Sequence, residues 1–451
     1  MKKRLLYALF VACLGGYVFV GSQVFQASAA KNKGDDVYAE LELFSRVLER
    51  VRRDYVDGDQ MTYEELVHGA LKGMLGSLDP HSEFMEPTAF EELKEDTEGE
   101  FSGVGMQVTQ RGEELVVVAP MEDTPAFEAG ILPGDKIRKI DGKSTEGLGV
   151  PDAVKLLRGK PGTPVTLTIE REGIPQPKEF PLKRQTIQVY TAKDIHNRRD
   201  FPVDDNKVGY VRLTQFGEKT GVELEEALRK MDKAGMQSLV LDLRGNPGGL
   251  LDEAVAVSEK FLKRGEPIVS TEGRNPANNI QRKASGSGKK WLAKDLPMVI
   301  LVNGGSASAS EIVSGALQDL KRATIIGQKS FGKGSVQSVL PMPDGSALRL
   351  TTAKYYTPSH KVIHGRGILP DVLVAMTEDE EIAIQLGRIP GGKDNLDQAL
   401  KAFPAERQVK LRELVQQNRD LQLEKAKEVL KSGKLVRLED SKTATTPAPK
   451  P

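Results

Sequence analysis

Residues 298–311, MVILVNGGSASASE, decide how the middle of this chain folds. The stretch opens with five consecutive apolar residues, and such runs are typical of a strand buried on both faces of a sheet. Two glycines then permit a sharp turn, and Ser306, Ser308 and Ser310 mark a helix start, because serine is a favoured helix cap. A strand that turns directly into a helix is the building unit of an α/β layered core.

The same pattern recurs on both sides of this stretch. Apolar strands alternate with helical segments, and a Pro-Asp-Gly turn between two alternating segments predicts a hairpin. Residues 272–290 are polar and rich in glycine and serine, so we expect a mobile loop there. The expected strands are 208–213, 238–243, 298–302 and 323–327, the helices are 221–233, 251–262 and 308–320, and the hairpin joins 336–340 to 347–355.

The first residues predict a targeting segment. A basic start is followed by an apolar run to about residue 20 and by the small-residue triplet at 27–29. A cleaved signal peptide and a retained membrane anchor both fit, and either predicts an exported protein, periplasmic or extracytoplasmic. The predicted domains of this α/β multidomain chain are 1–30 signal peptide or membrane anchor, 35–98 helical region, 99–185 compact β-rich unit, 186–375 α/β core, 376–440 helical region and 441–451 disordered tail.

Composition excludes several classes of function. Lys+Arg and Asp+Glu both number 64, so overall charge gives no reason to expect nucleic-acid binding. Cys13, the single cysteine, lies in the targeting segment, so a processed chain has neither disulfides nor a cysteine nucleophile. The five histidines include no pair with zinc-binding context. His360 and His364 leave a serine-histidine site open as an alternative.

The three serines have two interpretations. They are either helix caps and small packing residues, or one of them is a nucleophile exposed at a sheet edge. A helix N-terminus carries unpaired N–H groups and a partial positive charge, which suit a developing oxyanion. Spacing alone does not choose among Ser306, Ser308 and Ser310.

Lys333 offers a base for such a nucleophile. It lies between two glycines in residues 331–337, FGKGSVQ, and no acidic residue occurs from 323 to 340. A free lysine titrates near ~10.4 and must lose about 2 to 4 units to act as a base at neutral pH. The alternative interpretation is a solvated lysine in a turn.

Residues 327–333 also fit the first seven positions of a phosphate-binding loop. The eighth position needs Ser or Thr and is Gly334, and the residues that follow alternate like a strand, not a helix. We therefore reject nucleotide binding.

These motifs, together with the turn at 242–249 (DLRGNPGG), resemble the C-terminal processing peptidases, or tail-specific proteases, over residues 35 to 375. The resemblance implies a layered α/β peptidase core of the ClpP/crotonase type that needs no metal or cofactor. It implies that Ser308 is the nucleophile, Lys333 the general base and Gln337 the group that orients the lysine. The oxyanion is implied to bind the backbone N–H groups of Gly248 and Ala309. One departure is His360, where the family usually has glycine.

Residues 99–185 resemble the PDZ domain of that family, most clearly at 129–137 (AGILPGDKI). The resemblance implies that Gly103, Val104, Gly105 and Met106 bind the free C-terminus of a peptide. PDZ domains take such peptides as an added strand.

The expected function is that of a serine endopeptidase that cleaves exported proteins near their C-termini. An alternative is a PDZ scaffold on a degenerate core, acting as an adaptor. A further hypothesis is that the PDZ domain controls access to Ser308. The expected partners are protein substrates with free C-termini, an adaptor or activator protein, a membrane reached through the N-terminal segment, and further copies of the chain packed through the helical regions.

Overall fold

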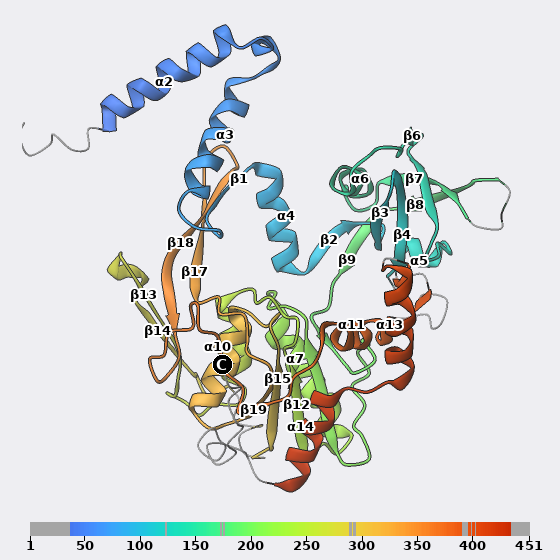
Figure 1. Cartoon of the computed structure of the whole chain (residues 1–451), viewed down its shortest axis with the longest axis vertical. Helices are drawn as coiled ribbons and strands as arrows, with labels where there is room; N and C mark the ends of the chain where they lie inside the picture. Colours follow the sequence, from blue (N-terminus) through green and yellow to red (C-terminus); the bar gives the residue numbers. More distant parts are fainter. Residues whose placement is uncertain are drawn as a thin grey trace, which may run out of the picture. The chain divides into compact units, whose positions relative to one another are not determined.

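The computed structural model describes residues 37–121, 124–171, 174, 176–287, 291, 295–389, 396–397, 399–401 and 403–433. The predicted targeting segment and the predicted tail lie outside these residues. The described chain forms two compact units that divide between Phe84 and Met85, and Figure 1 labels their elements. Within the described ranges, we find no helix with the length and apolar character needed to cross a membrane.

The first unit is helical, as predicted. It contains α2 (Val37–Asp54), the short 3-10 helix η1 (Gly58–Gln60) and α3 (Tyr63–Gly76), and β1 (Glu83–Met85) spans its end. Thr62 begins α3 with a capping box: its hydroxyl accepts from the Glu65 amide, and the Glu65 carboxylate accepts from the Thr62 amide. No residue of α2 is buried, although apolar side chains recur along it at helical spacing.

The second unit begins with α4 (Pro87–Glu98) and a two-stranded ladder of β2 (Glu100–Gly103) and β9 (Gln185–Gln188), which brackets a small β-rich domain. The sheet runs in the order β3 (Met106–Arg111), β4 (Glu114–Pro120), β5 (Lys136–Ile140), β7 (Pro164–Glu170) and β8 (Lys178–Lys183), with β6 (Lys143–Ser144) beside β5 and the helices α5 (Pro125–Glu128) and α6 (Val150–Leu157).

The α/β core is built on a six-stranded sheet whose five later strands are parallel. All four strands predicted for it are present. The order is β10 (Ala192–Lys193), β11 (Val208–Leu213), β12 (Ser238–Asp242), β15 (Met298–Val302), β16 (Thr324–Gly327) and β19 (Val372–Leu373), with β10 antiparallel at one edge.

Both faces of this sheet are covered, which explains the unbroken apolar runs of its strands. Along β15, Met298, Ile300 and Val302 pack into the cluster formed with α7 (Thr220–Lys233), α8 (Leu251–Ser258) and α10 (Ala309–Asp319). Val299 and Leu301 face the other way, into a cluster that contains four buried residues of α14 (Leu421–Ser432). The C-terminal helix α14 is therefore one layer of the core.

A second sheet contains the predicted hairpin of β17 (Ser335–Pro341) and β18 (Ala347–Tyr356). The expectation of a mobile loop over 272–290 is wrong in part. β13 (Pro267–Gly273) pairs with β18 and with β14 (Ile280–Lys283), and η2 (Pro276–Asn278) lies between them. The strand β17 directly follows Gly334, so the structure confirms that no helix follows the loop at 327–333.

The C-terminal region is helical, as predicted. Among its described residues it contains α11 (Glu378–Gly387), α13 (Ala405–Gln417) and α14. Leu386, Leu400 and Leu411 form a small core of their own between the first two helices.

Candidate active site

The three sequence motifs follow three neighbouring strands. The turn at 242–249 follows β12, the turn at 303–308 follows β15, and the loop at 328–333 follows β16. Asp242 pairs with Leu301, and Val302 pairs with Gly327. Because these strands are parallel, their carboxyl ends lie at one edge of the sheet, and the motifs meet there.

Hydrogen bonding distinguishes the three serines that the sequence leaves equivalent. The Ser306 hydroxyl donates to the Leu243 carbonyl at 2.8 Å, and the Ser310 hydroxyl donates to the Asn246 carbonyl at 3.0 Å. Both serines are fully buried, whereas Ser308 keeps 8% of its surface exposed. Ser306 and Ser310 therefore hold the two turns together, which leaves Ser308 as the candidate nucleophile.

Ser308 has an unusual backbone conformation. It is the residue before the first turn of α10, with φ +52° and ψ −110°. A non-glycine residue in such a region costs roughly 1 to 3 kcal/mol, and such strain clusters at functional sites. Sharp strand-to-helix turns of this kind present a serine hydroxyl above a sheet.

A buried carboxylate joins this turn to the loop at 328–333, the lysine loop, which carries Lys333. Glu311 is fully buried, and its Oε2 accepts from the backbone amides of Ser308 at 2.8 Å and Lys333 at 2.9 Å. Its Oε1 accepts from the Gly332 amide at 2.7 Å and from the Ser330 hydroxyl at 2.5 Å. Two amides bonded to one oxygen are necessarily close neighbours, so Glu311 fixes the backbone of Ser308 beside that of Lys333.

These donors offset only part of the cost of burying Glu311, so the pKa of its carboxyl stays above its usual value. Burial raises the pKa of the Glu311 carboxyl, while the hydrogen bonds from Ser330, Gly332, Ser308 and Lys333 act to lower it. Sequence reasoning did not assign Glu311 a role. The spacing of Ser308 and Glu311, three residues apart at a helix start, matches a capping box and is the signal that points to it.

Gly248 lies against the proposed nucleophile. Its φ is +105°, and a Cβ at this position would lie 2.8 Å from the Ser308 Cβ and 3.1 Å from the Ala309 amide nitrogen, so only glycine fits. The Gly248 amide, however, donates to Asn246 Oδ1 at 2.9 Å. The structure thus brings Gly248, Ser308 and Ala309 together, while the Gly248 N–H is engaged within its own turn.

Lys333 is half-buried at the end of the lysine loop, two residues before β17. Gln337 lies on β17, where its Nε2 donates to the hydroxyls of Ser335 at 2.9 Å and Thr351 at 3.2 Å. These two bonds fix the orientation of the Gln337 amide and commit its nitrogen end.

The two late histidines are exposed. His360 Nε2 lies 2.8 Å from Glu272 Oε1, and the imidazole stacks on Tyr356 with 4.6 Å between ring centroids. The backbone of His364 packs so closely on Gly334 that a Cβ on this glycine would lie 2.2 Å from the His364 nitrogen. These contacts give His360 a partner other than a serine. In the part of the chain that the structure describes, no cluster of three or more His, Cys, Asp or Glu side chains is suited to a metal ion.

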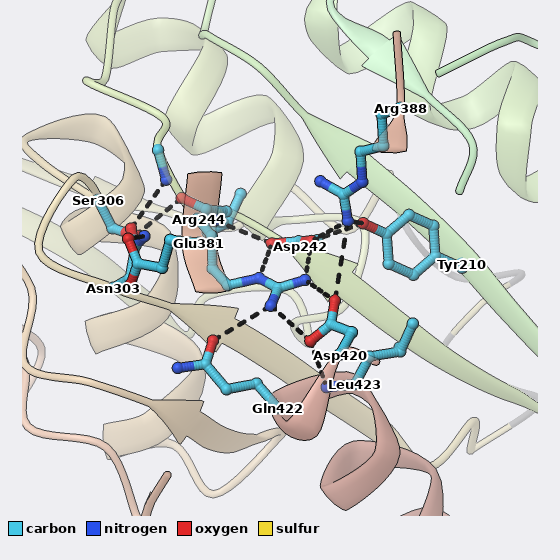
Figure 2. Close-up of polar contacts among 12 residues, drawn as sticks. Tyr210, Asp242, Arg244, Asn303, Ser306, Glu381, Arg388, Asp420, Gln422 and Leu423 are labelled. Carbon is cyan, nitrogen blue, oxygen red and sulfur yellow. Dashed lines mark hydrogen bonds and ion pairs between the residues drawn. The ribbon is translucent and has the colours of Figure 1, made fainter. Parts of the chain in front are cut away.

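The turn at 242–249 begins with a buried ion pair, which Figure 2 shows at its centre. Arg244 donates to both carboxylate oxygens of Asp242, at 2.9 and 2.7 Å. The Tyr210 hydroxyl also donates to Asp242, at 2.5 Å. Burial alone would raise the pKa of the Asp242 carboxyl, but the positive charges of Arg244 and Arg388 and these hydrogen bonds hold the pKa well below its usual range.

A separate groove lies in the β-rich domain. β3 is an edge strand of its sheet in the described residues, and α6 runs beside it. The space between them measures about 510 Å³. All four residues expected to bind a peptide C-terminus, Gly103, Val104, Gly105 and Met106, line it, together with apolar side chains of α6.

Replacing Glu311 tests the link between the two loops. We expect Glu311→Ala to lower the free energy of unfolding by roughly 3 to 5 kcal/mol, because several buried donors lose an acceptor at about 1 to 3 kcal/mol each. Ser330→Ala, which removes one of these donors, should cost about 1 kcal/mol. Urea unfolding followed by circular dichroism measures both values. A loss below about 1 kcal/mol for Glu311→Ala would contradict the assigned role.

Comparison with known proteins agrees with this geometry. The model of peptidase family S41 matches residues 207–374, and a PDZ-domain model matches residues 116–171. A carboxy-terminal-processing protease of Bartonella bacilliformis is 45% identical over 371 residues, covering 81% of each chain. The carboxy-terminal processing protease CtpA of Bacillus subtilis is 35% identical over 369 residues, covering 82% of this chain and 75% of that protein.

Among solved structures, the photosystem II D1 C-terminal processing protease is 31% identical, with a TM-score of 0.42. The match covers 74% of this chain and 93% of that protein's chain. Three observations agree on one family. They are the edge of parallel strands that carries Ser308, the groove of the β-rich domain and the extent of the sequence matches. The chain is a serine peptidase that belongs to the carboxy-terminal processing proteases of peptidase family S41.

Proposed function

We propose that Ser308 and Lys333 form the catalytic dyad of this peptidase and that it cleaves exported proteins near their C-termini. The observation that carries the proposal is the Glu311 carboxylate, which accepts from the amides of both residues on the same oxygen. The choice of Ser308 is further supported by its strained backbone and by the structural use of the two serines beside it.

The chemistry follows from these positions. A neutral Lys333 amine takes the proton of the Ser308 hydroxyl as the oxygen attacks the peptide carbonyl. The tetrahedral intermediate collapses when the leaving amine takes that proton, which leaves an acyl-enzyme. Water then hydrolyses the ester: the Lys333 amine takes a proton from the water and returns it to the departing Ser308 oxygen. The dyad requires no metal.

The oxyanion needs donors beside Ser308. The Ala309 amide is the first of α10, where helix geometry provides no intrahelical acceptor and the helix dipole is positive. Gly248 is the second proposed donor. Its amide would have to exchange Asn246 Oδ1 for the oxyanion, since it donates to that oxygen in the structure. Gln337 is proposed to orient Lys333 through its carbonyl oxygen, because its nitrogen is committed to two hydroxyls.

Substitution of the two dyad residues tests the mechanism. We expect Ser308→Ala and Lys333→Ala each to lower kcat by roughly 10⁴-fold or more without unfolding the protein. Lys333→Arg should be equally inactive, because arginine keeps the charge but cannot act as a neutral base. Cleavage of an unfolded protein, followed by mass spectrometry, is the measurement.

Lys329→Ala is the matched control, since this exposed lysine lies in the same loop and should keep full activity. Turnover by Lys333→Arg within tenfold of the unmodified protein would refute the dyad. If the unmodified protein cleaves no unfolded substrate, that result would instead support the alternative in which the chain acts as an adaptor.

The β-rich domain is proposed to capture the substrate C-terminus. Successive amides of residues 103–106 can form a nest for the carboxylate, and the open edge of β3 can pair with the preceding residues. Capture there would feed the adjoining segment to Ser308 and explain cleavage near the tail.

A charge placed in the groove tests capture. Val154 of α6 lines the groove, so Val154→Asp should raise KM for a peptide with a free C-terminus by about tenfold, with kcat unchanged. The same peptide with an amidated C-terminus should be affected less. Lys155→Asp, on the exposed side of α6, is the control. Equal effects on both peptides would argue against carboxylate binding in the groove.

We also propose that the protein is exported by its N-terminal segment, and that retention of this segment would anchor the protein to the membrane. We further propose that the protein acts as a homo-oligomer with an adaptor or activator protein. The support for assembly is α2, whose Leu41, Phe44 and Val47 are exposed at helical spacing. Analytical ultracentrifugation of residues 31–451 should give a mass above that of one chain, and Phe44→Glu should reduce it. A single-chain mass at micromolar concentration would exclude assembly through α2.

A further inference from the structure

The C-terminal helices reach the active-site turns with buried polar groups, as Figure 2 shows. Asp420, which precedes α14, accepts from Arg244 Nη1 at 2.8 Å and from Arg244 Nη2 at 2.7 Å. Gln422, fully buried in α14, accepts from the same Nη1 at 3.2 Å. The side chain of Arg244 is only 8% exposed, so this contact is shielded from water and from salt screening.

Arg244 thereby connects the C-terminal region to the start of the turn that carries Gly248. One side of its guanidinium is bound to Asp242, and the other is bound to Asp420. Arg388, just after α11, adds a second tie, because it donates to the Tyr210 hydroxyl at 2.8 Å and to Asp242 at 3.4 Å. The positive charges of the two arginines therefore balance the negative charges of Asp242 and Asp420. Charged groups are buried at tolerable cost only when they are paired in this way.

A second contact reaches both turns at once. Glu381 of α11 accepts from Asn303 Nδ2 at 2.9 Å. The other end of the same amide, Asn303 Oδ1, accepts from the Gly245 amide at 2.8 Å and from the Gly305 amide at 3.1 Å. Glu381 therefore orients the side chain that pins the turn after β12 to the turn after β15.

Asp420 and Gln422 are held by a helix that packs on the central sheet. Leu423, Ala426, Val429 and Leu430 of α14 are buried against the central sheet. Asp420 also caps this helix, since its Oδ1 accepts from the Leu423 amide at 3.0 Å. The position of Asp420 is thus fixed relative to the strands whose ends carry the active site.

We propose that the helix α11 and the capped helix α14 are positioning elements of the active site, which hold the turns of Gly248 and Ser308 in register through Glu381 and Asp420. The inference rests on the proposed Ser308 mechanism. Oxyanion donors act only within about 2.7–3.1 Å of the developing charge, and a misplacement of about 1 Å costs on the order of 10²-fold in rate. Loss of either contact should therefore slow chemistry while substrate capture persists.

Asp420→Asn separates the two roles of Asp420. Asparagine caps a helix as well as aspartate does, so α14 keeps its cap, while Arg244 loses a charged partner. We expect kcat, and the rate at which a fluorophosphonate probe acylates Ser308, to fall by about tenfold or more, with KM for a peptide substrate unchanged. Thr377→Ala is the matched control, because it removes the cap of α11, and Thr377 bonds to Glu380, outside the turns. It should lower thermal stability and leave kcat unchanged.

Glu381 supplies an independent pair of variants. Glu381→Ala removes the acceptor for Asn303 and should slow acylation by about tenfold. Glu381→Gln presents a carbonyl oxygen at the same place and should recover most of the rate. A role in stability alone predicts that Glu381→Ala and Thr377→Ala behave alike.

The results separate this inference from the dyad. If the unmodified protein is not acylated at Ser308, the proposed function fails. If it is acylated, but Asp420→Asn and Glu381→Ala retain its kcat and its acylation rate, the positioning role is overturned. It is equally overturned if the loss of acylation rate in Asp420→Asn and Glu381→Ala is no larger, for a given loss of thermal stability, than in Thr377→Ala.

Discussion

One buried carboxylate holds the candidate active site of this protease together. Glu311 lies fully buried, and its two oxygens receive four donors from the turn of Ser308 and the loop of Lys333. A carboxylate without such partners would cost several kcal/mol to bury, so the loops and Glu311 stabilise one another. The same bonds offset the strain at Ser308, whose amide is held in a conformation that few side chains adopt.

The sheet provides the frame on which this carboxylate works. Three neighbouring parallel strands end at one edge, and each contributes one of the segments that meet at Ser308. The hydroxyls of Ser306 and Ser310 and the side chain of Asn303 join the first two segments, and Glu311 joins the third. The C-terminal helix α14 completes the core from the opposite face and brings Asp420 to the same edge.

Much of this architecture can be predicted from sequence, because local patterns encode it. The strands β12 and β15 have both faces buried, so their sequences are continuous apolar runs. The sequence gives no signal for the strand β14, because it carries polar, mostly exposed residues at a sheet edge and has the composition of a loop.

The site itself is less accessible to sequence reasoning. Ser306 and Ser310 are distinguished from Ser308 by their contacts with Leu243 and Asn246, more than sixty residues earlier in the chain. The partner of Arg244 lies 176 residues away, at Asp420. The engagement of the Gly248 amide by Asn246 depends on side-chain geometry that no motif specifies.

The central claim is that a neutral amine at Lys333 activates the Ser308 hydroxyl. The pH dependence of Ser308 acylation by a fluorophosphonate probe, with the labelled residue identified by mass spectrometry, tests it most directly. The account predicts that the rate rises with pH through one ionisation to a plateau, with a midpoint well below the ~10.4 of a free lysine. A rate that keeps rising up to that value, or label on a serine other than Ser308, would contradict it.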